Sequence, residues 1–284
     1  MEIKKVGVVG CGFMGSGIVQ VCAQSGYQVV VTRKNPKLLD KGIASIDYYL
    51  TRDVEKGRIS QQDRDSALSR IKGTTNTKDF SDCDLVVEAV PEDMDLKKKV
   101  FAEFDKVCPR QAILASNTSC LSVIELAMVT SKPDKVLGLH FLSPVPLSRL
   151  LEIVKTVATS DDTLETGTQF GKSLGKAVIV AKDTPGFIFN RLVIPWQLNA
   201  VRMLEAGIAT REDIDNTMKL GLSYPIGPLA LCDFNGIDVV CMVAQAMYEE
   251  TKELQYAPPV LMKKMVAAGW LGRKTGKGFY EYNK

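Results

Sequence analysis

Short apolar segments alternate with amphipathic ones along the first half of the chain. The apolar segments are residues 3–9, 28–31, 84–89, 112–115, 136–140, 151–155 and 177–180, with helix-like spacing over intervals such as 95–107 and 163–174. Most of these segments are apolar throughout, which is typical of strands buried on both faces. The alternation of strands and helices predicts an α/β fold with a mostly parallel sheet and helices on both of its faces.

The pattern changes after the sequence Asp-Thr-Pro-Gly at residues 183–186. Apolar residues then recur at helical spacing over residues 189–204. We expect a later helix to begin at Gly227-Pro228 and to run continuously to about residue 248. The chain is therefore predicted to form an α/β domain of residues 1–184 and a smaller all-helical domain of residues 185–284.

A glycine-rich loop follows the first apolar segment and opens a helical one. It reads Gly10-Cys11-Gly12-Phe13-Met14-Gly15. The first glycine permits a tight turn, the second lets a pyrophosphate approach the backbone, and the third lets helix and strand pack closely. Glycine-rich turns also occur as plain strand–helix connections. Its position at the start of a β-α-β unit favours a dinucleotide site, and hence a Rossmann-type domain with Gly10, Gly12, Phe13, Met14 and Gly15 at the cofactor.

The end of the second strand predicts which dinucleotide is bound. Sites for NAD usually carry an acid there, which hydrogen-bonds the ribose 2′-hydroxyl. This chain has Thr32-Arg33-Lys34 instead. A guanidinium pairs well with a 2′-phosphate, so we expect NADP to be preferred. The alternative is that the two cations are simply solvated and that NAD is bound through the backbone.

Composition and charge exclude several other classes of protein. The chain is 45% hydrophobic and 24% charged, and its net charge of +3 is too small and too evenly spread to indicate nucleic-acid binding. The sequence holds no apolar run of membrane-spanning length and no evident secretory signal, so no membrane partner is expected. Its seven cysteines are scattered singly, which favours reduced thiols in the cytoplasm and gives no zinc or other metal motif.

His140 is the only histidine, and it ends a predicted strand. Open α/β sheets bind ligands at this edge, and imidazole is suited to proton transfer near neutral pH. A satisfied core histidine is the alternative. The following strand is expected to bring Glu152 beside His140, where a carboxylate would orient the ring. The polar residues Ser116 to Ser119 follow the predicted strand at residues 112–115, and Asn190 lies at the start of the helical domain.

Several motifs together resemble the short-chain L-3-hydroxyacyl-CoA dehydrogenases, most closely the bacterial enzymes that act on 3-hydroxybutyryl-CoA. The motifs are GCGFMG, SNTS, GLHFLSP, the strand glutamate, PGFIFNR and the C-terminal GWLGRKTGKGFY. They occur in the family's order and spacing over the whole chain. Each would be weak alone, and their combination is specific.

This resemblance implies reversible hydride transfer between a nicotinamide and a short (S)-3-hydroxyacyl-CoA. His140 would be the general acid and base, with Glu152 as its carboxylate partner. Ser119 and Asn190 would hydrogen-bond the 3-oxygen and the thioester end of the substrate. The helical domain would complete the substrate site and form a homodimer.

The resemblance also implies which residues contact the cofactor. Glu92, Lys97 and Lys274 match positions near the nicotinamide half of the cofactor. Ser143 stands where the family has an asparagine that contacts the cofactor, and its hydroxyl could replace part of that contact. Arg33 departs from the usual aspartate.

One further prediction concerns the substrate. Arg52 and Lys56 are candidates to bind the phosphates of coenzyme A, and the alternative is that they are ordinary solvated side chains.

Two other functions compete with this one. The first is a 3-hydroxyacid dehydrogenase acting on a substrate without coenzyme A, and the second is a dinucleotide-binding protein without catalysis.

Overall fold

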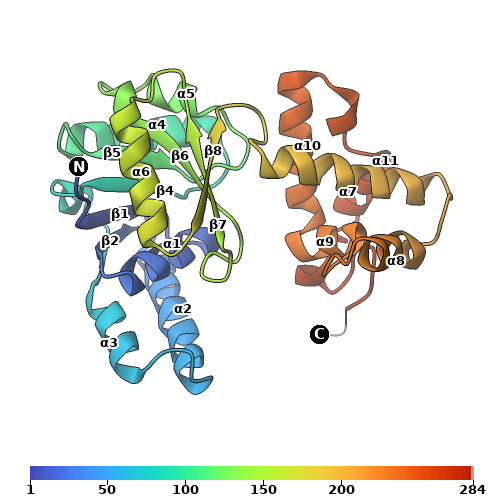
Figure 1. Ribbon diagram of the computed structural model, residues 1–284, viewed down its shortest axis with the longest axis horizontal. Coiled ribbons are helices and arrows are strands. Elements are labelled where there is room, and N and C mark those ends of the chain that lie inside the picture. The colour runs from blue at the N-terminus through green and yellow to red at the C-terminus, as the bar shows by residue number, and fades with distance from the viewer. Residues whose placement is uncertain (283–284) are drawn as a thin grey trace. The chain divides into compact units, whose positions relative to one another are not determined.

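An eight-stranded sheet organises the first part of the computed structural model, which describes residues 1–282 (Figure 1). The strands are β1 (Lys5–Val9), β2 (Gln28–Thr32), β3 (Ile71–Thr74), β4 (Leu85–Glu88), β5 (Ile113–Ser116), β6 (Val136–Phe141), β7 (Leu150–Lys155) and β8 (Ala177–Lys182). Their order is β3-β2-β1-β4-β5-β6-β7-β8. Neighbouring strands of this sheet run parallel, except that β7 runs antiparallel to β6.

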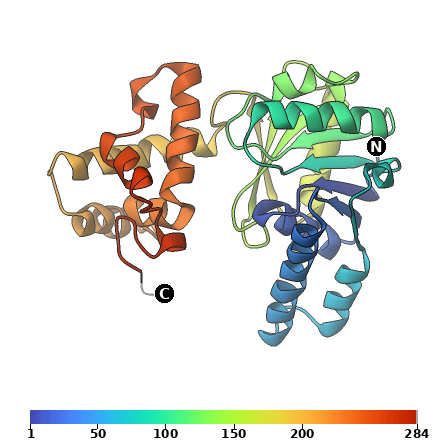
Figure 2. The ribbon, with the colours of Figure 1, turned by 180° about the vertical axis from the view of Figure 1, so that it is seen from behind.

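Helices cover both faces of this sheet. They are α1 (Phe13–Gln24), α2 (Pro36–Glu55), α3 (Gln61–Ser69), α4 (Met94–Val107), α5 (Val123–Ala127) and α6 (Asp161–Ser173). Figures 1 and 2 show α6 on one face and α4 on the other, while α2 and α3 extend beyond the sheet as a pair. The predicted fold class is confirmed.

Burial explains why the apolar segments form the central strands. The four residues of β4 and the four of β5 are all buried, as expected for strands covered on both faces. Strand β3 was not predicted, because Ile71-Lys72-Gly73-Thr74 lacks an apolar run. It forms as an edge strand through its pairing with β2.

The chain divides into two compact units between Asp183 and Thr184. The second unit is helical, with α7 (Phe189–Glu205), α8 (Arg211–Gly221), α9 (Pro228–Asn235), α10 (Ile237–Thr251) and α11 (Val260–Ala267). The expectation of one continuous helix from Gly227 to about residue 248 is wrong. Gly236 has φ +96°, which lies outside the helical region, and α9 and α10 are bent by 99° at this residue.

Among residues 1–282, no single helix has both the length and the apolarity needed to cross a bilayer. The bent pair α9–α10 passes the same test of length and composition only when its two helices are taken together.

Candidate active site

Functional side chains gather at the carboxyl edge of the sheet because parallel strands end there together. The glycine loop follows β1, Glu88 ends β4, and Ser116 ends β5. His140 is the penultimate residue of β6. This edge is therefore where the first unit can bind and transform a ligand.

His140 and Glu152 form a buried pair across the antiparallel strands β6 and β7. The strand register places them directly opposite each other, so both side chains project from the same face of the sheet. The distance from His140 Nδ1 to Glu152 Oε2 is 2.6 Å, and the exposed fractions of the two residues are 3% and 1%. Since an ionised carboxylate can only accept, the histidine Nδ1–H donates and the ring orientation is fixed.

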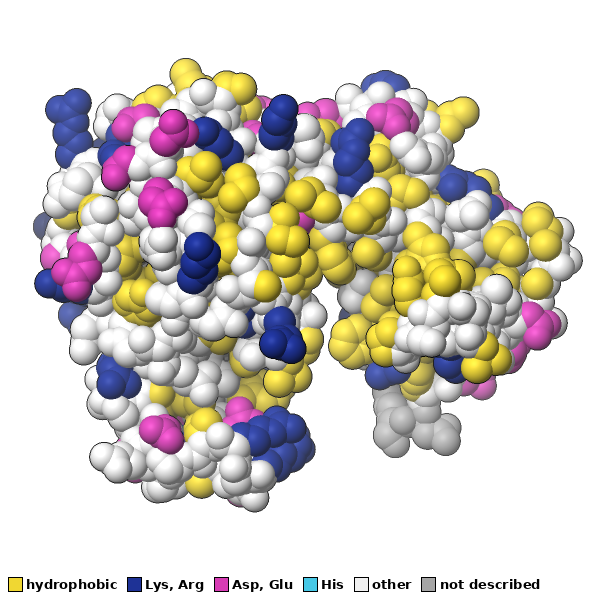
Figure 3. Space-filling view, in the orientation of Figure 1, with side chains coloured by type: hydrophobic (Ala, Val, Ile, Leu, Met, Phe, Trp, Pro, Cys, Tyr) yellow, Lys and Arg dark blue, Asp and Glu magenta, His cyan; other side chains and the backbone are white. Residues whose placement is uncertain are grey.

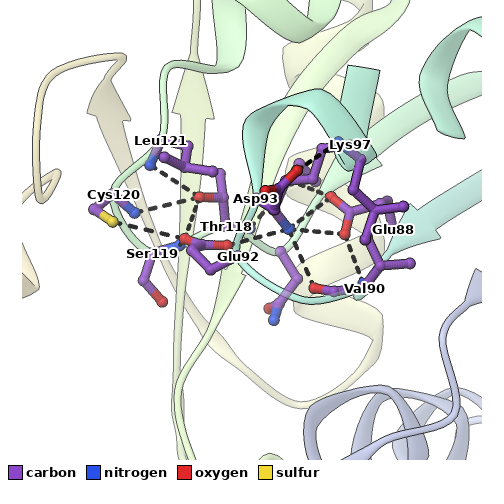
Figure 4. Close-up of polar contacts among 12 residues, drawn as sticks. Glu88, Val90, Glu92, Asp93, Lys97, Thr118, Ser119, Cys120 and Leu121 are labelled. Carbon is purple, nitrogen blue, oxygen red and sulfur yellow. Dashed lines mark hydrogen bonds and ion pairs between the residues drawn. The ribbon is translucent and has the colours of Figure 1, made fainter. Parts of the chain in front are cut away.

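A second buried ionic cluster lies beside this edge, and sequence reasoning found only part of it (Figure 4). We call Glu88, Glu92 and Lys97 the Lys97 cluster. Lys97 is 1% exposed, and its Nζ lies 2.8 and 3.0 Å from the two oxygens of Glu88. Glu92 Oε2 is 3.1 Å from the same nitrogen. Glu88 was missed because an acid at the end of a buried strand has no partner nearby in sequence.

Glu92 ties the Lys97 cluster to the loop that follows β5. Its Oε1 accepts hydrogen bonds from Thr118 Oγ1 at 2.6 Å and from the Ser119 backbone N–H at 2.9 Å. Burial acts to raise the pKa of Glu92, but the Lys97 charge and these hydrogen bonds outweigh it and hold the pKa below the usual value. The cluster thereby positions the backbone of the loop that carries Ser119.

Glu88 has a different balance of the same effects. Burial raises its pKa above the usual value, although the Lys97 ammonium and the Ser116 hydroxyl act against this rise. Ser116 Oγ donates to Glu88 Oε2 at 2.7 Å. Both carboxylates of the cluster therefore depend on the Lys97 ammonium as their counter-charge, Glu88 in a buried position and Glu92 in a half-buried one.

The glycine loop fits the pyrophosphate of a dinucleotide. A Cβ on Gly12 would meet no atom within 4 Å, so the backbone there is open to a ligand. A Cβ on Gly15 would lie 1.8 Å from Gly10 O, which excludes any side chain at that position. Within α1, no side chain caps the N-terminus and the first turn holds no acid, so this helix end suits an anion.

A cavity of about 610 Å³ extends from the glycine loop along α1 and α2. Residues 144–147, in the loop after β6, form another wall. Among its described lining residues the cations are Arg33, Lys41, Arg52, Lys56 and Arg58, and the acid is Asp53, which pairs with Arg58 at 3.0 Å. Figure 3 shows basic side chains gathered toward the end of α2. The cavity is therefore suited to a ligand that carries several phosphates.

The remaining predicted cofactor residues of the first unit differ in exposure. Arg33 is half-buried, and its Nη1 donates to Cys11 O, inside the glycine loop, at 3.1 Å. Thr32 is buried, whereas Lys34 is exposed. Ser143 is exposed on the loop after β6. Arg33 is therefore the member of this group that faces both the loop and the cavity.

The two predicted residues of the second unit lie on separate elements. Asn190 is the second residue of α7 and is 9% exposed. Lys274 lies in the short 3-10 helix Arg273–Thr275, where its Nζ is 2.6 Å from the Asp238 carboxylate. Asp238 therefore holds the Lys274 side chain against the start of α10.

The whole chain is similar to proteins of one family. Residues 5–184 match the family described as 3-hydroxyacyl-CoA dehydrogenase, NAD binding domain, and residues 186–282 match its C-terminal domain. A 3-hydroxybutyryl-CoA dehydrogenase of Mycobacterium tuberculosis is 45% identical over 282 residues, which cover 99% of each chain.

Two solved structures agree with these matches. FadB2 of Mycobacterium tuberculosis has a TM-score of 0.98 at 44% identity, with 100% of both chains covered. An (S)-3-hydroxybutyryl-CoA dehydrogenase from Ralstonia eutropha has a TM-score of 0.95 at 43% identity, again over 100% of both chains. The resemblance expected from the motifs is confirmed.

Removing the Lys97 ammonium tests how far the cluster depends on it. Lys97→Met is expected to lower the free energy of unfolding at pH 7 by about 3 kcal/mol, because the buried Glu88 carboxylate and the half-buried Glu92 carboxylate lose their counter-charge. The loss is expected to shrink as the pH falls toward about 5, since protonation of either carboxylate removes an uncompensated buried charge. Urea unfolding of the variant and the wild type at both pH values measures this.

Lys98→Met is the matched control on the same helix. Lys98 pairs with the exposed Glu125 at 2.6 Å, so its removal should change the free energy of unfolding by less than about 1 kcal/mol at either pH. Equal losses for the two variants, or a Lys97→Met loss that does not change with pH, would contradict a charged, buried Lys97.

Proposed function

Because the chain belongs to the 3-hydroxyacyl-CoA dehydrogenase family, we propose that it oxidises a short (S)-3-hydroxyacyl-CoA reversibly at C3. The preferred pair of substrates is 3-hydroxybutyryl-CoA and acetoacetyl-CoA. The observation that carries this proposal is the buried His140–Glu152 pair at the carboxyl edge of the sheet. Full-length similarity to relatives named for this activity supports it.

His140 moves the proton of the reaction. A bound nicotinamide would supply the hydride acceptor for oxidation at C3 and the hydride donor for reduction. As the C3–H bond breaks, His140 Nε2 takes the proton of the 3-hydroxyl group, and the carbonyl forms. In reduction the imidazolium gives this proton back to the developing alkoxide. Glu152 holds Nδ1–H and stabilises the charged ring in both directions.

Other predicted residues orient the two ligands. Ser119 and Asn190 hydrogen-bond the 3-oxygen and the thioester end, which polarises the carbonyl toward hydride attack. Glu92, Lys97, Ser143 and Lys274 hold the nicotinamide half. The ordered backbone of Ser119, fixed by Glu92, supports the first of these roles.

NADP is the proposed preferred cofactor. Arg33 lies against the glycine loop through its bond to Cys11 O, at the end of β2. A guanidinium at this place attracts a 2′-phosphate, whereas the usual carboxylate would repel one.

Coenzyme A is the proposed occupant of the far part of the cavity. Arg52 and Lys56 line it near the end of α2, and Arg58 adds a third cation there. Phosphate contacts need such exposed basic groups, which keep much of their hydration when no ligand is bound.

The second unit is proposed to complete the substrate site and to pair with a second copy of the chain. It exposes large apolar side chains, including Leu192, Leu220, Leu222 and Val260, whose exposed fractions are 70%, 82%, 61% and 58%. Burying such groups favours association. Sedimentation equilibrium at micromolar concentration is expected to give twice the chain mass, and a monomer would contradict the proposal.

The cytoplasm is the proposed compartment because the thiols suit a reducing environment. Burial raises the pKa of Cys22 and of Cys83 to about 12, so both are inert thiols of the core.

Replacing His140 tests the proton-transfer role. His140→Asn is expected to lower kcat for acetoacetyl-CoA reduction by about 10²- to 10⁴-fold, because the variant loses the imidazole that gives the proton. Glu152→Gln should cost less, since the ring loses its orientation and counter-charge but stays in place. Cofactor affinity, measured by fluorescence titration, should not change in either variant.

Two outcomes would end this assignment. One is near-normal turnover by His140→Asn. The other is a wild type that reduces free acetoacetate as well as its coenzyme A thioester, which would favour a dehydrogenase acting without coenzyme A.

Arg33 and Arg52 serve as mutual controls because they line one cavity. Arg33→Asp is expected to raise KM for NADPH by about 10-fold or more and to leave KM for acetoacetyl-CoA unchanged. Arg52→Ala should show the reverse pattern, because it contacts only the phosphates of coenzyme A. Initial rates with NADPH and NADH measure both. A wild type that prefers NADH, with no effect of Arg33→Asp, would refute the NADP proposal.

A further inference from the structure

Lys176 is a buried cation whose two partners are backbone carbonyls. It lies in the turn between α6 and β8 and is 8% exposed. Its Nζ donates to Val145 O at 2.7 Å and to Ser148 O at 2.6 Å. Burial lowers its pKa below the usual value. Burying an ammonium is costly, and the two hydrogen bonds to Val145 O and Ser148 O compensate for this cost only while the segment that carries both carbonyls stays in place.

Both carbonyls belong to residues 142–149, which we call the β6–β7 loop. Pro144, Val145, Pro146 and Leu147 of this loop form one wall of the cavity. The β6–β7 loop also connects the strand that carries His140 to the strand that carries Glu152. Its shape therefore bears on the cavity that borders the candidate active site.

The β6–β7 loop is held on two sides. Val145 is 2% exposed and packs so closely on α1 that a Cβ added to Gly17 would lie 2.9 Å from its own Cβ. On the other side, Lys176 binds the carbonyls at both ends of the segment 145–148. Between these anchors, Leu147 is 67% exposed and lines the cavity, and the backbone N–H groups of Leu147 and Ser148 donate to Pro144 O at 3.0 and 2.9 Å. This turn gives the segment its local shape, and Lys176 fixes the turn to the connection between α6 and β8.

We propose that Lys176 is a positioning residue for the acyl-CoA, which acts by holding the β6–β7 loop as a wall of the cavity. The proposal rests on the proposed function in one respect, that coenzyme A occupies this cavity. The His140–Glu152 pair lies within the β6–β7 ladder, where Gly138–Phe141 pair with Leu151–Val154. Loosening the loop should therefore weaken substrate binding and leave the proton-transfer geometry intact.

Lys132 provides a matched control. It is 4% exposed, burial lowers its pKa as well, and its Nζ donates to a backbone carbonyl, Pro109 O, at 2.8 Å. Pro109 lies before the amino end of β5, whereas His140 lies near the carboxyl end of β6. Neither Lys132 nor Pro109 lines the cavity. Lys132→Met and Lys176→Met thus each remove a buried ammonium that donates to backbone carbonyls. Only the carbonyls bound by Lys176 belong to a wall of the cavity.

The kinetic experiment compares the two methionine variants with the wild type. Lys176→Met is expected to raise KM for acetoacetyl-CoA by about 10-fold, which corresponds to about 1.4 kcal/mol, while kcat changes by less than about 2-fold. Lys132→Met should lower stability and leave both constants unchanged. Lys176→Arg, which keeps the charge and the donors, should restore most of the affinity.

Limited proteolysis reports on the β6–β7 loop without any substrate. Arg149 is exposed at the end of this loop, and trypsin is expected to cleave after it faster in Lys176→Met than in Lys132→Met or the wild type. Identical cleavage rates and identical kinetics for the two methionine variants would overturn the proposal and leave Lys176 a purely structural residue. A fall in kcat at constant KM would overturn it too.

Failure of the proposed function gives a different result. In that case the wild type itself does not turn over acetoacetyl-CoA, while cleavage at Arg149 still decides whether Lys176 holds the loop.

Discussion

The site depends on one reversal of chain direction. Strand β7 runs antiparallel to β6 in a sheet whose other neighbouring strands are parallel. The hairpin sets Glu152 opposite His140 at 2.6 Å, with both side chains buried. A buried imidazolium is tolerated only beside a carboxylate that holds it. Because the pair lies inside a strand ladder, the register that sets the two residues opposite each other cannot change unless backbone hydrogen bonds break, and the placement of the pair is therefore part of the fold.

The Lys97 cluster lies at the same edge of the sheet and has a different structural role. Lys97 is bonded to Glu88 and Glu92, and Glu92 in turn fixes the backbone of Ser119 (Figure 4). These bonds join β4, α4 and the loop after β5. A hydrophobic replacement could fill the space as well, but it could not orient a loop through carboxylate hydrogen bonds. The cluster is thus better explained by the loop it orders than by the stability it adds.

The sequence predicted most of the sheet because the central strands are continuous apolar runs, and it predicted the His140–Glu152 pair because a returning strand must lie beside β6. It did not predict β3, whose residues pair with β2 without being apolar. It did not predict the break at Gly236 either, since a glycine within a helical pattern is often tolerated. Glu88 was missed because its partner Lys97 lies nine residues away on another element.

In the proposed function, the cavity recognises its two phosphate-bearing ligands at separate places. Arg33 donates to Cys11 O, and Cys11 packs on Gly42 in the middle of α2. Arg52 lies ten residues further along this helix, which is about 15 Å at the rise of an α-helix. This is about twice the screening length of about 8 Å at physiological ionic strength. A change of charge at Arg33 therefore alters the potential at the glycine loop more than the potential at Arg52, so the proposed choice of dinucleotide and the proposed binding of coenzyme A depend on different cations.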